Sequence, residues 1–133
     1  MCKILVIDDA KDNLTVFSIL FKMIKIEHGF EYELFLLNPD EQNSIEEYVL
    51  KIEPDIIFLD IKLPKKSGIE IFDALRILGY EKPIIAQTAS VTKTEVDVYK
   101  EIFNDGIVEK PVDDKKIISI LSKHGFWEKE NVK

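Results

Sequence analysis

Short apolar segments recur along the chain, and their alternation with helical patterns is the feature that most constrains the fold. The segments 4–7, 56–59 and 84–86 are apolar at every position, which is typical of strands buried on both faces of a parallel sheet. Between such segments, apolar residues recur at helical spacing. Strands that alternate with helices form parallel sheets, and right-handed crossovers place the helices on both faces. We therefore predict an α/β fold with a doubly wound, five-stranded parallel sheet and helices on both faces.

Turn and cap residues set the predicted boundaries. The expected strands are 3–7, 31–37, 55–60, 83–88 and 107–109. The first helix is expected to begin near Asp12, its N-cap, and to end at His28; the other helices are expected at 45–52, 68–78, 92–103 and 112–124. The chain has 133 residues, so one domain is the natural count. We assign residues 1–125 to that domain and 126–133 to a charged C-terminal tail.

The composition argues against several classes of protein. The net charge of −7 opposes nonspecific nucleic-acid binding and docking on anionic membranes, since both require basic surfaces. No segment is apolar for long enough to span a membrane, and acidic residues interrupt the N-terminal segment too early for a signal peptide. Cys2 is the only cysteine, so we expect no internal disulfide and a reducing, cytoplasmic location.

Polar residues follow the predicted strands at the points where the strands end. Asp8 and Asp9 follow the first strand and Asp60 ends the third. Thr88 ends the fourth strand, and Lys110 follows the fifth. Ligands of open α/β sheets bind at the carboxyl edge of the strands. We therefore expect three carboxylates, a hydroxyl and an ammonium group in one pocket.

This set of groups suits a divalent metal ion beside an aspartate that accepts a phosphoryl group. Mg²⁺ takes one or two carboxylates and keeps several waters, and carboxylates can form aspartyl phosphates. Asp60 is the expected nucleophile, because a central strand aims it out of the sheet edge. Lys110 would supply a fixed positive charge and Thr88 a hydroxyl donor. Without a cation the three carboxylates would repel one another, and at least one pKa should rise.

Each of these residues, taken alone, also has an ordinary structural explanation. An Asp-Asp pair is usually a solvated turn. A single Asp or Thr at a strand end often caps the next helix, and Lys-Pro commonly begins a helix. It is their order, and their shared position at strand ends, that favours a functional site.

With these residues in place, residues 3–124 of the chain resemble the receiver domain of two-component response regulators. In that family an acidic pair follows the first strand, the phosphoacceptor Asp ends the third, Thr or Ser ends the fourth, and Lys-Pro follows the fifth. Here these places are held by Asp8-Asp9, Asp60, Thr88 and Lys110-Pro111, at successive intervals of 51, 28 and 22 residues from Asp9. The loop 63–68 (LPKKSG) resembles the family's MPxx(D/S)G, and residues 8–14 (DDxxxNL) resemble receivers linked to hybrid histidine kinases.

The resemblance implies a ligand set and partners. Asp9 would bind Mg²⁺ directly and Asp8 mostly through water, and Asp60 and the backbone carbonyl of Lys62 would complete the protein ligands. The Lys110–Pro111 peptide would be cis. The phosphoryl donor would be a phosphohistidine on a histidine kinase or histidine phosphotransfer protein. Phosphorylation would then switch binding to a downstream protein, with the chain acting as a stand-alone receiver in a phosphorelay.

Two features depart from the family pattern: the residue at position 107, and the Asp9–Asp60 segment, which is several residues longer than is common. Ile107 stands where the family usually has an aromatic residue, so we expect signalling through backbone shifts near residues 88–93. A hydrolase of the haloacid dehalogenase type would need an Asp two residues after the nucleophile, where this chain has Lys62. A receiver fold that is never phosphorylated and serves only as an interaction module stays open.

Overall fold

A computed structural model describes residues 1–41, 44–63, 65–89 and 92–127. In this part of the chain five parallel strands form one sheet in the order β2-β1-β3-β4-β5. The strands are β1 (Cys2–Ile7), β2 (Tyr32–Leu37), β3 (Ile56–Asp60), β4 (Ile84–Thr88) and β5 (Ile107–Glu109). The helices are α1 (Lys11–His28), α2 (Ile45–Ile52), α3 (Gly68–Leu78), α4 (Lys93–Ile102) and α5 (Asp114–Lys123), with a short 3-10 helix η1 (Pro39–Glu41). The doubly wound fold predicted from the sequence is confirmed.

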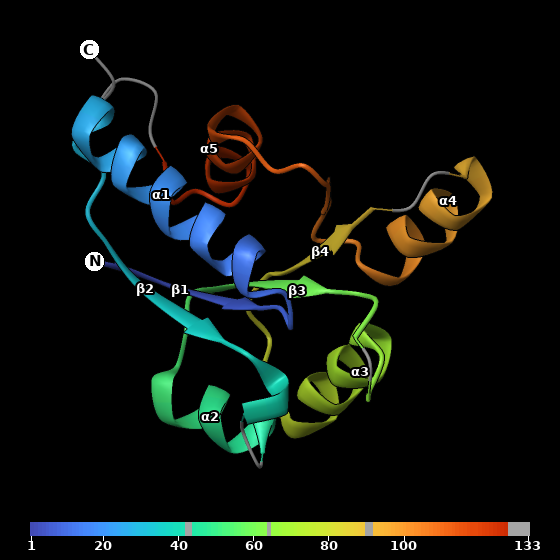
Figure 1. Ribbon diagram of the computed structural model, residues 1–133. Coiled ribbons are helices and arrows are strands. Elements are labelled where there is room, and N and C mark those ends of the chain that lie inside the picture. Colours follow the sequence, from blue (N-terminus) through green and yellow to red (C-terminus); the bar gives the residue numbers. More distant parts are fainter. Residues whose placement is uncertain (42–43, 64, 90–91, 128–133) are drawn as a thin grey trace.

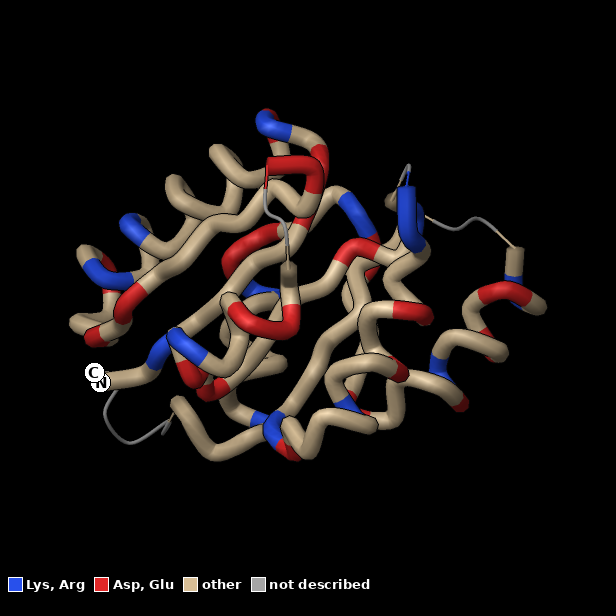
Figure 2. The backbone as a smooth tube through the Cα atoms, turned by 90° about the horizontal axis from the view of Figure 1, so that it is seen from below, with Lys and Arg blue, Asp and Glu red and all other residues tan. Residues whose placement is uncertain are grey.

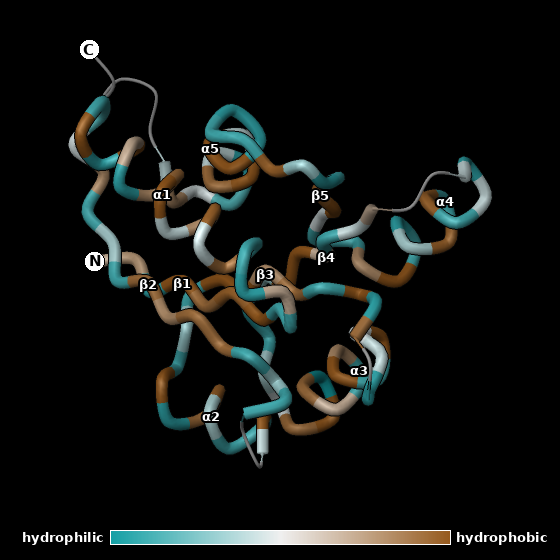
Figure 3. Tube along the Cα trace, in the orientation of Figure 1, coloured by the Kyte–Doolittle hydropathy of each residue, from teal (hydrophilic) through white to brown (hydrophobic). Residues whose placement is uncertain are grey.

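The sheet lies between two layers of helices. In Figure 1, α1 and α5 cover one face, α2 and α3 cover the other, and α4 stands beyond β4. Each face has its own apolar cluster; Phe17 of α1, for example, contacts Phe58 of β3 with ring centroids 5.4 Å apart. The central strands are accordingly the most apolar part of the molecule (Figure 3). Burial of each such side chain contributes about 1.5–3 kcal/mol, which fixes the strands and their register.

The first helix begins two residues earlier than a cap at Asp12 would place it. α1 starts at Lys11 with Ala10 as its N-cap, so the prediction that Asp12 caps it was wrong. The reason is that the Asp8 carboxylate accepts the Ala10 N–H at 2.8 Å and tightens the turn directly after β1. The side chain that orders the start of α1 therefore precedes the helix and also belongs to the acidic pair.

The last helix begins two residues later than predicted. α5 starts at Asp114, because Asp113 acts as its N-cap and accepts the Lys116 N–H at 2.8 Å. The peptide between Lys110 and Pro111 is cis, as predicted. The remaining strand and helix ends agree with the prediction to within one residue.

A hydrogen-bonded turn fixes the amino edge of the sheet. The Asp105 carboxylate accepts the backbone N–H of Ile84 in β4 at 3.2 Å and pairs with the guanidinium of Arg76 in α3 at 2.8 Å. The Asp105 backbone carbonyl lies 2.7 Å from Nε2 of His124, at the end of α5. One residue thus joins both helical layers to the strands, at the edge opposite the predicted site.

Charged residues cover the outside of the molecule. Acidic residues outnumber basic ones by 25 to 18, and Figure 2 shows the two kinds interspersed along the chain. Several form exposed ion pairs, such as Lys25 with Glu31 at 3.8 Å, and such pairs contribute little to stability. Within the described residues, no helix has both the length and the apolar character needed to cross a membrane.

Two residues of the predicted C-terminal tail pack against the core. Trp127 is 7% exposed and belongs to the apolar cluster on the α1/α5 face, and Phe126 packs beside it. The Trp127 ring lies 5.2 Å from the ring of Phe30 and 5.1 Å from that of His28, measured between centroids. The rest of the predicted tail, residues 128–133, lies outside the described residues.

Replacing Trp127 with alanine tests this packing. Because the substitution removes a buried aromatic ring, we expect Trp127→Ala to lower the free energy of unfolding by about 3 kcal/mol. Ile26→Ala is the matched control, since Ile26 is 83% exposed and exposed substitutions change stability by about 0.5 kcal/mol or less. Urea unfolding followed by circular dichroism measures both. A Trp127→Ala midpoint equal to that of the wild type would place residue 127 in a tail.

Candidate metal and phosphoryl site

Polar residues extend the apolar rows of the sheet at its carboxyl edge. Side chains alternate between the faces of a strand, so every second residue points to the same helical layer. On the α1/α5 face the rows are Ile4-Val6-Asp8, Ile56-Phe58-Asp60, Ile85-Gln87 and Val108-Lys110. Strand pairing continues to these ends, since the Asp8 N–H donates to the Leu37 carbonyl at 3.1 Å and the Lys110 N–H to the Thr88 carbonyl at 2.8 Å. The side-chain rows that form the core on this face therefore end in polar groups at the carboxyl edge of the sheet.

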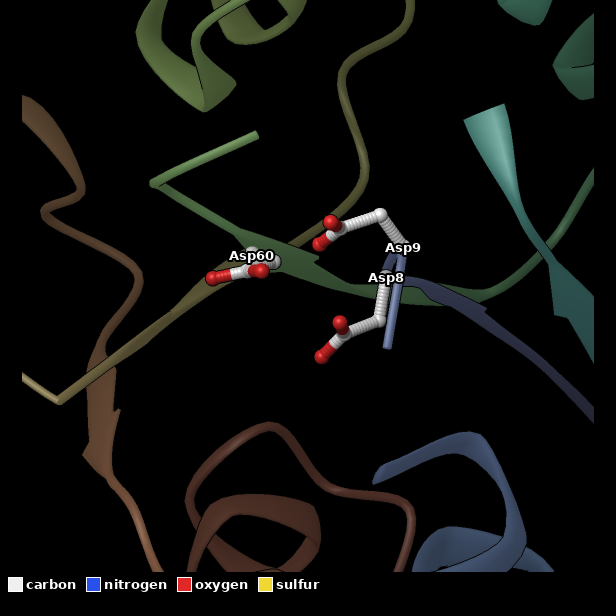
Figure 4. A group of neighbouring side chains, drawn as sticks. All are labelled: Asp8, Asp9 and Asp60. Carbon is white, nitrogen blue, oxygen red and sulfur yellow. The ribbon is translucent and has the colours of Figure 1, made fainter. Parts of the chain in front are cut away.

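Three carboxylates and one ammonium group meet at this edge. Oxygens of Asp8, Asp9 and Asp60 all lie within 4.8 Å of one another. Figure 4 shows Asp8 leaving the turn after β1 toward the α1/α5 side and Asp9 leaving it on the opposite side. Nζ of Lys110 lies 3.4 Å from Asp8 Oδ2 and 3.3 Å from Asp60 Oδ1. The structure thus brings together four of the residues predicted for the site.

The surroundings of Asp60 disfavour its charge. Asp60 is 5% exposed, and Asp8 beside it is fully buried. Burial, together with the negative charge of Asp8, raises the pKa of Asp60 to about 6, although Lys110 opposes the shift. A raised pKa in this cluster was predicted from repulsion between the carboxylates; burial is the larger cause, and repulsion by Asp8 adds to it. A divalent cation at the cluster would offset that repulsion.

Thr88 and Lys62 lie on the periphery of the cluster. Thr88 is 2% exposed and ends β4. By the alternation along the strand it lies on the face of Ala86, which packs toward α2 and α3, so it approaches the edge from that side. The Lys62 side chain is 68% exposed and pairs with Glu95 of α4 at 3.7 Å, so the role expected of its backbone carbonyl does not involve this side chain. Pro64, Ser90 and Val91, from the loop motif and the predicted switch segment, lie outside the described residues.

A glycine allows the loop after β3 to fold against the site. A Cβ atom on Gly68 would lie 2.4 Å from the backbone carbonyl oxygen of Asp60 and 2.7 Å from Cα of Ile61. The Gly68 N–H donates to the Ile61 carbonyl at 2.7 Å, and Ser67 caps α3 by accepting the Glu70 N–H at 3.2 Å. The glycine of the loop motif is therefore required because α3 starts in contact with the backbone of Asp60.

Sequence reasoning gave no role to two residues that contact the site. Asn13 donates from Nδ2 to Oδ2 of Asp8, and from the same nitrogen to Oε1 of Gln87 at 2.9 Å. Gln87 is fully buried in β4. A signal for each was present in the sequence, since Asn13 belongs to the motif at residues 8–14 and Gln87 is a polar residue within an apolar strand.

The donor set fits a hard divalent cation. Carboxylate oxygens are the ligands that Mg²⁺ prefers, and the ion needs only one or two of them beside water and phosphate oxygens. Among the described residues, Asp8, Asp9 and Asp60 are the group whose ligand atoms lie close enough together to hold a metal ion. The two positive charges of such an ion would cancel the net charge of −2 that three ionised carboxylates and one lysine carry together.

Comparison with known proteins identifies the family. Residues 4–122 match the family described as response regulator receiver domain. The chain belongs to this family. Receiver domains are signalling domains, generally without enzymatic activity, that take phosphoryl groups from histidine kinases and act on downstream partners. The acidic cluster, the lysine and the cis peptide thus lie in a fold where phosphoryl transfer to an aspartate is the common chemistry.

Similar proteins include both kinases and regulators. The receiver is 29% identical over 123 residues to the osmosensing histidine protein kinase SLN1 of Saccharomyces cerevisiae, covering 91% of this chain and 10% of SLN1. It is 28% identical over 133 residues to the transcriptional regulatory protein CpxR of Escherichia coli, covering 98% of this chain and 53% of CpxR. The chain therefore spans about half the length of CpxR and a tenth of SLN1.

Solved structures share the fold. The chemotaxis protein CheY4 of Vibrio cholerae superimposes with a TM-score of 0.75 at 21% sequence identity, covering 93% of this chain and 98% of that one. At this identity the likeness concerns the arrangement of strands and helices, which agrees with the receiver fold described above.

The pKa of Asp60 predicts how stability depends on pH. The folded pKa of about 6 lies above the usual value of 3.8, so the folded protein holds this proton more tightly and loses stability as the pH rises from about 4 to about 6. Asp60→Asn removes the charge. In EDTA we expect the variant to be more stable than the wild type by on the order of 2–3 kcal/mol at pH 8, with the difference vanishing below pH 4. Urea unfolding across this pH range measures it. A difference independent of pH would contradict the assignment.

Proposed function

We propose that this receiver accepts a phosphoryl group on Asp60 from a histidine kinase or a histidine phosphotransfer protein, with Mg²⁺ as cofactor. Asp8, Asp9, Asp60 and the backbone carbonyl of Lys62 would hold the ion. The phosphorylated form would change its affinity for a downstream protein partner, without binding nucleic acid or membrane. The single cysteine suits a cytoplasmic setting.

The observation that carries this proposal is the position of Lys110. Its Nζ lies within 3.4 Å of oxygens on both Asp8 and Asp60, so a positive charge stands beside the carboxylate that would react. Structural ion pairs of this kind usually involve one acid and one base. Here one lysine faces two carboxylates, and burial together with repulsion by Asp8 leaves the pKa of Asp60 raised. Perturbed carboxylates of this sort are typical of functional sites.

The residues have defined roles in the transfer. An oxygen of ionised Asp60 attacks the phosphorus of the donor, a P–O bond forms, the donor's P–N bond breaks, and the imidazole leaves with the electron pair. Mg²⁺, when bound, supplies charge neutralisation at the phosphoryl oxygens. Lys110 can turn from the carboxylates to a phosphoryl oxygen, and Thr88 can donate its hydroxyl from the opposite face. The chain assists its own phosphorylation in this way without converting a separate substrate.

Phosphorylation would then change the balance between two states. The phosphoryl group adds about −1.5 to −2 charge and new acceptor oxygens. If Lys110 and Thr88 pair with those oxygens, the ends of β4 and β5 shift together, because they are joined by the hydrogen bond from the Lys110 N–H to the Thr88 carbonyl. The face formed by α4, β5 and α5 lies next to these ends. Its affinity for a partner would change by a population shift.

Intact mass spectrometry tests the acceptor chemistry. The wild type is incubated with acetyl phosphate and Mg²⁺, and we expect a gain of one phosphoryl group. Asp60→Asn, which keeps the size of the side chain, is the matched control and should gain none, and neither should the wild type in EDTA. Mg²⁺ dependence and the Asp60 requirement together distinguish this site from adventitious acylation of surface residues.

The competing function gives a different result. A receiver fold that serves only as an interaction module would gain no phosphoryl group and would also form no stable adduct with beryllofluoride. If the wild type gains no mass but forms the beryllofluoride adduct, rapid hydrolysis of the aspartyl phosphate accounts for the missing mass and the receiver function stands. A phosphoryl group found on Asp60→Asn would contradict the assignment of the acceptor.

A further inference from the structure

A pair of amides, half-buried Asn13 and fully buried Gln87, connects α1 to β4 beside the carboxylates. Nδ2 of Asn13 donates to Asp8 Oδ2 and to Gln87 Oε1, the second bond measuring 2.9 Å. The two bonds use both hydrogens of that nitrogen. Gln87 lies opposite Asp60 in the register between β3 and β4, and on the same face. Oδ2 of Asp8 is thus contacted by both Asn13 and Lys110.

Packing alone does not account for a glutamine at position 87. The side chain is fully buried, and its Nε2 has no hydrogen-bond partner among the described residues. A buried donor without a partner destabilises a fold, and methionine has nearly the same size without that donor. What glutamine provides and methionine cannot is an acceptor for the second hydrogen of the Asn13 amide.

The two acids of the pair are held differently. Asp8 Oδ1 accepts the Ala10 N–H at 2.8 Å, and Asp8 Oδ2 faces Asn13 and, at 3.4 Å, Nζ of Lys110. Asp9 is half-buried, and its carboxylate makes no hydrogen bond or ion pair with any described residue. Asp8 therefore has a fixed orientation, whereas the acceptor positions of Asp9 are available to a ligand.

We propose that Asn13 and Gln87 are positioning residues for the divalent cation. They fix the Asp8 carboxylate, so that the ion meets it in one orientation and no rotamer freedom of that side chain is lost on binding. The inference rests on the proposed function, which places Mg²⁺ at these carboxylates. Neither residue contacts the transferred group in this scheme; both act through Asp8. Partners of this kind, which orient a metal ligand, typically change metal affinity about 10–100-fold.

Calorimetric titration with Mg²⁺, without any phosphodonor, tests this role. We expect Gln87→Met to weaken Mg²⁺ binding about tenfold, while its urea midpoint equals or exceeds that of the wild type because the unpaired amide is gone. Asn13→Leu should weaken binding at least as much. The double variant should bind like Asn13→Leu, since residues in one hydrogen-bonded chain are not additive. If Gln87 had only a structural role, its replacement would not weaken Mg²⁺ binding while leaving the urea midpoint equal or higher.

The control is Thr15→Val, in the same turn of α1. The Thr15 hydroxyl donates only to the Lys11 carbonyl of its own helix, at 3.1 Å, so this variant should bind Mg²⁺ like the wild type. Wild-type affinity in Gln87→Met would overturn the inference, and so would a loss of affinity accompanied by a lower urea midpoint. If the wild type itself neither binds Mg²⁺ nor gains a phosphoryl group, the proposed function fails as well. If the wild type is phosphorylated with Mg²⁺ and Gln87→Met binds normally, only the positioning role fails.

Discussion

The crowding of carboxylates beside one lysine, at the carboxyl edge of the sheet, is the interaction on which the rest of the site depends. Asp8 is fully buried and Asp60 almost so, and Lys110 contacts both. Removing carboxylates from water disfavours their charge, and a like charge nearby adds to the effect. One lysine reduces this conflict without removing it, and the pKa of Asp60 stays raised. The site is therefore suited to a divalent cation and, when that cation is present, to a reactive carboxylate.

The sheet can maintain this unfavourable arrangement because it is held at both edges. At the amino edge, Asp105 joins α3, β4 and α5 through its carboxylate and its backbone carbonyl. At the carboxyl edge, Gly68 lets α3 begin in contact with the backbone of Asp60. Between them lie strands whose apolar side chains fill both faces. The cost of the buried charges is offset by this packing, since each buried aliphatic or aromatic side chain contributes about 1.5–3 kcal/mol.

The alternation of side chains along a strand explains how polar groups at the carboxyl edge of the sheet face both helical layers. Asp8, Asp60, Gln87 and Lys110 extend the rows that face α1 and α5, whereas Thr88 extends the row of Ala86 toward α2 and α3. A group bound at Asp60 would thus be approached by Lys110 from one face and by Thr88 from the other. Hydrogen bonding between β4 and β5 joins these two residues through the backbone. A change of charge at Asp60 can in this way alter contacts on both faces of the sheet.

Much of this arrangement could be predicted from the sequence, because strand and helix patterns are local. The apolar segments predicted five parallel strands, and the carboxyl-edge rule placed Asp8, Asp9, Asp60 and Lys110 in one cluster, where the structure finds them. Charge and proximity also predicted the direction of the Asp60 pKa shift, whereas its largest cause, burial, depends on the tertiary structure. The start of α1 did not follow from local chemistry. Asp12 has the chemistry of an N-cap, but the Asp8 carboxylate accepts the Ala10 N–H and the helix begins at Lys11.

Only the tertiary structure decided which side chains meet across the sheet. Asn13 and Gln87 are 74 residues apart, and their hydrogen bond depends on where the start of α1 lies relative to the end of β4, which no local pattern encodes. The same is true of Trp127, which lies beyond the domain boundary expected from the sequence and packs against Phe30 and His28. The sequence by itself determined the order of strands and helices and the chemistry of the strand ends, since both follow from short-range periodicity. The partners of each buried polar group depended on the three-dimensional packing of helices on the sheet.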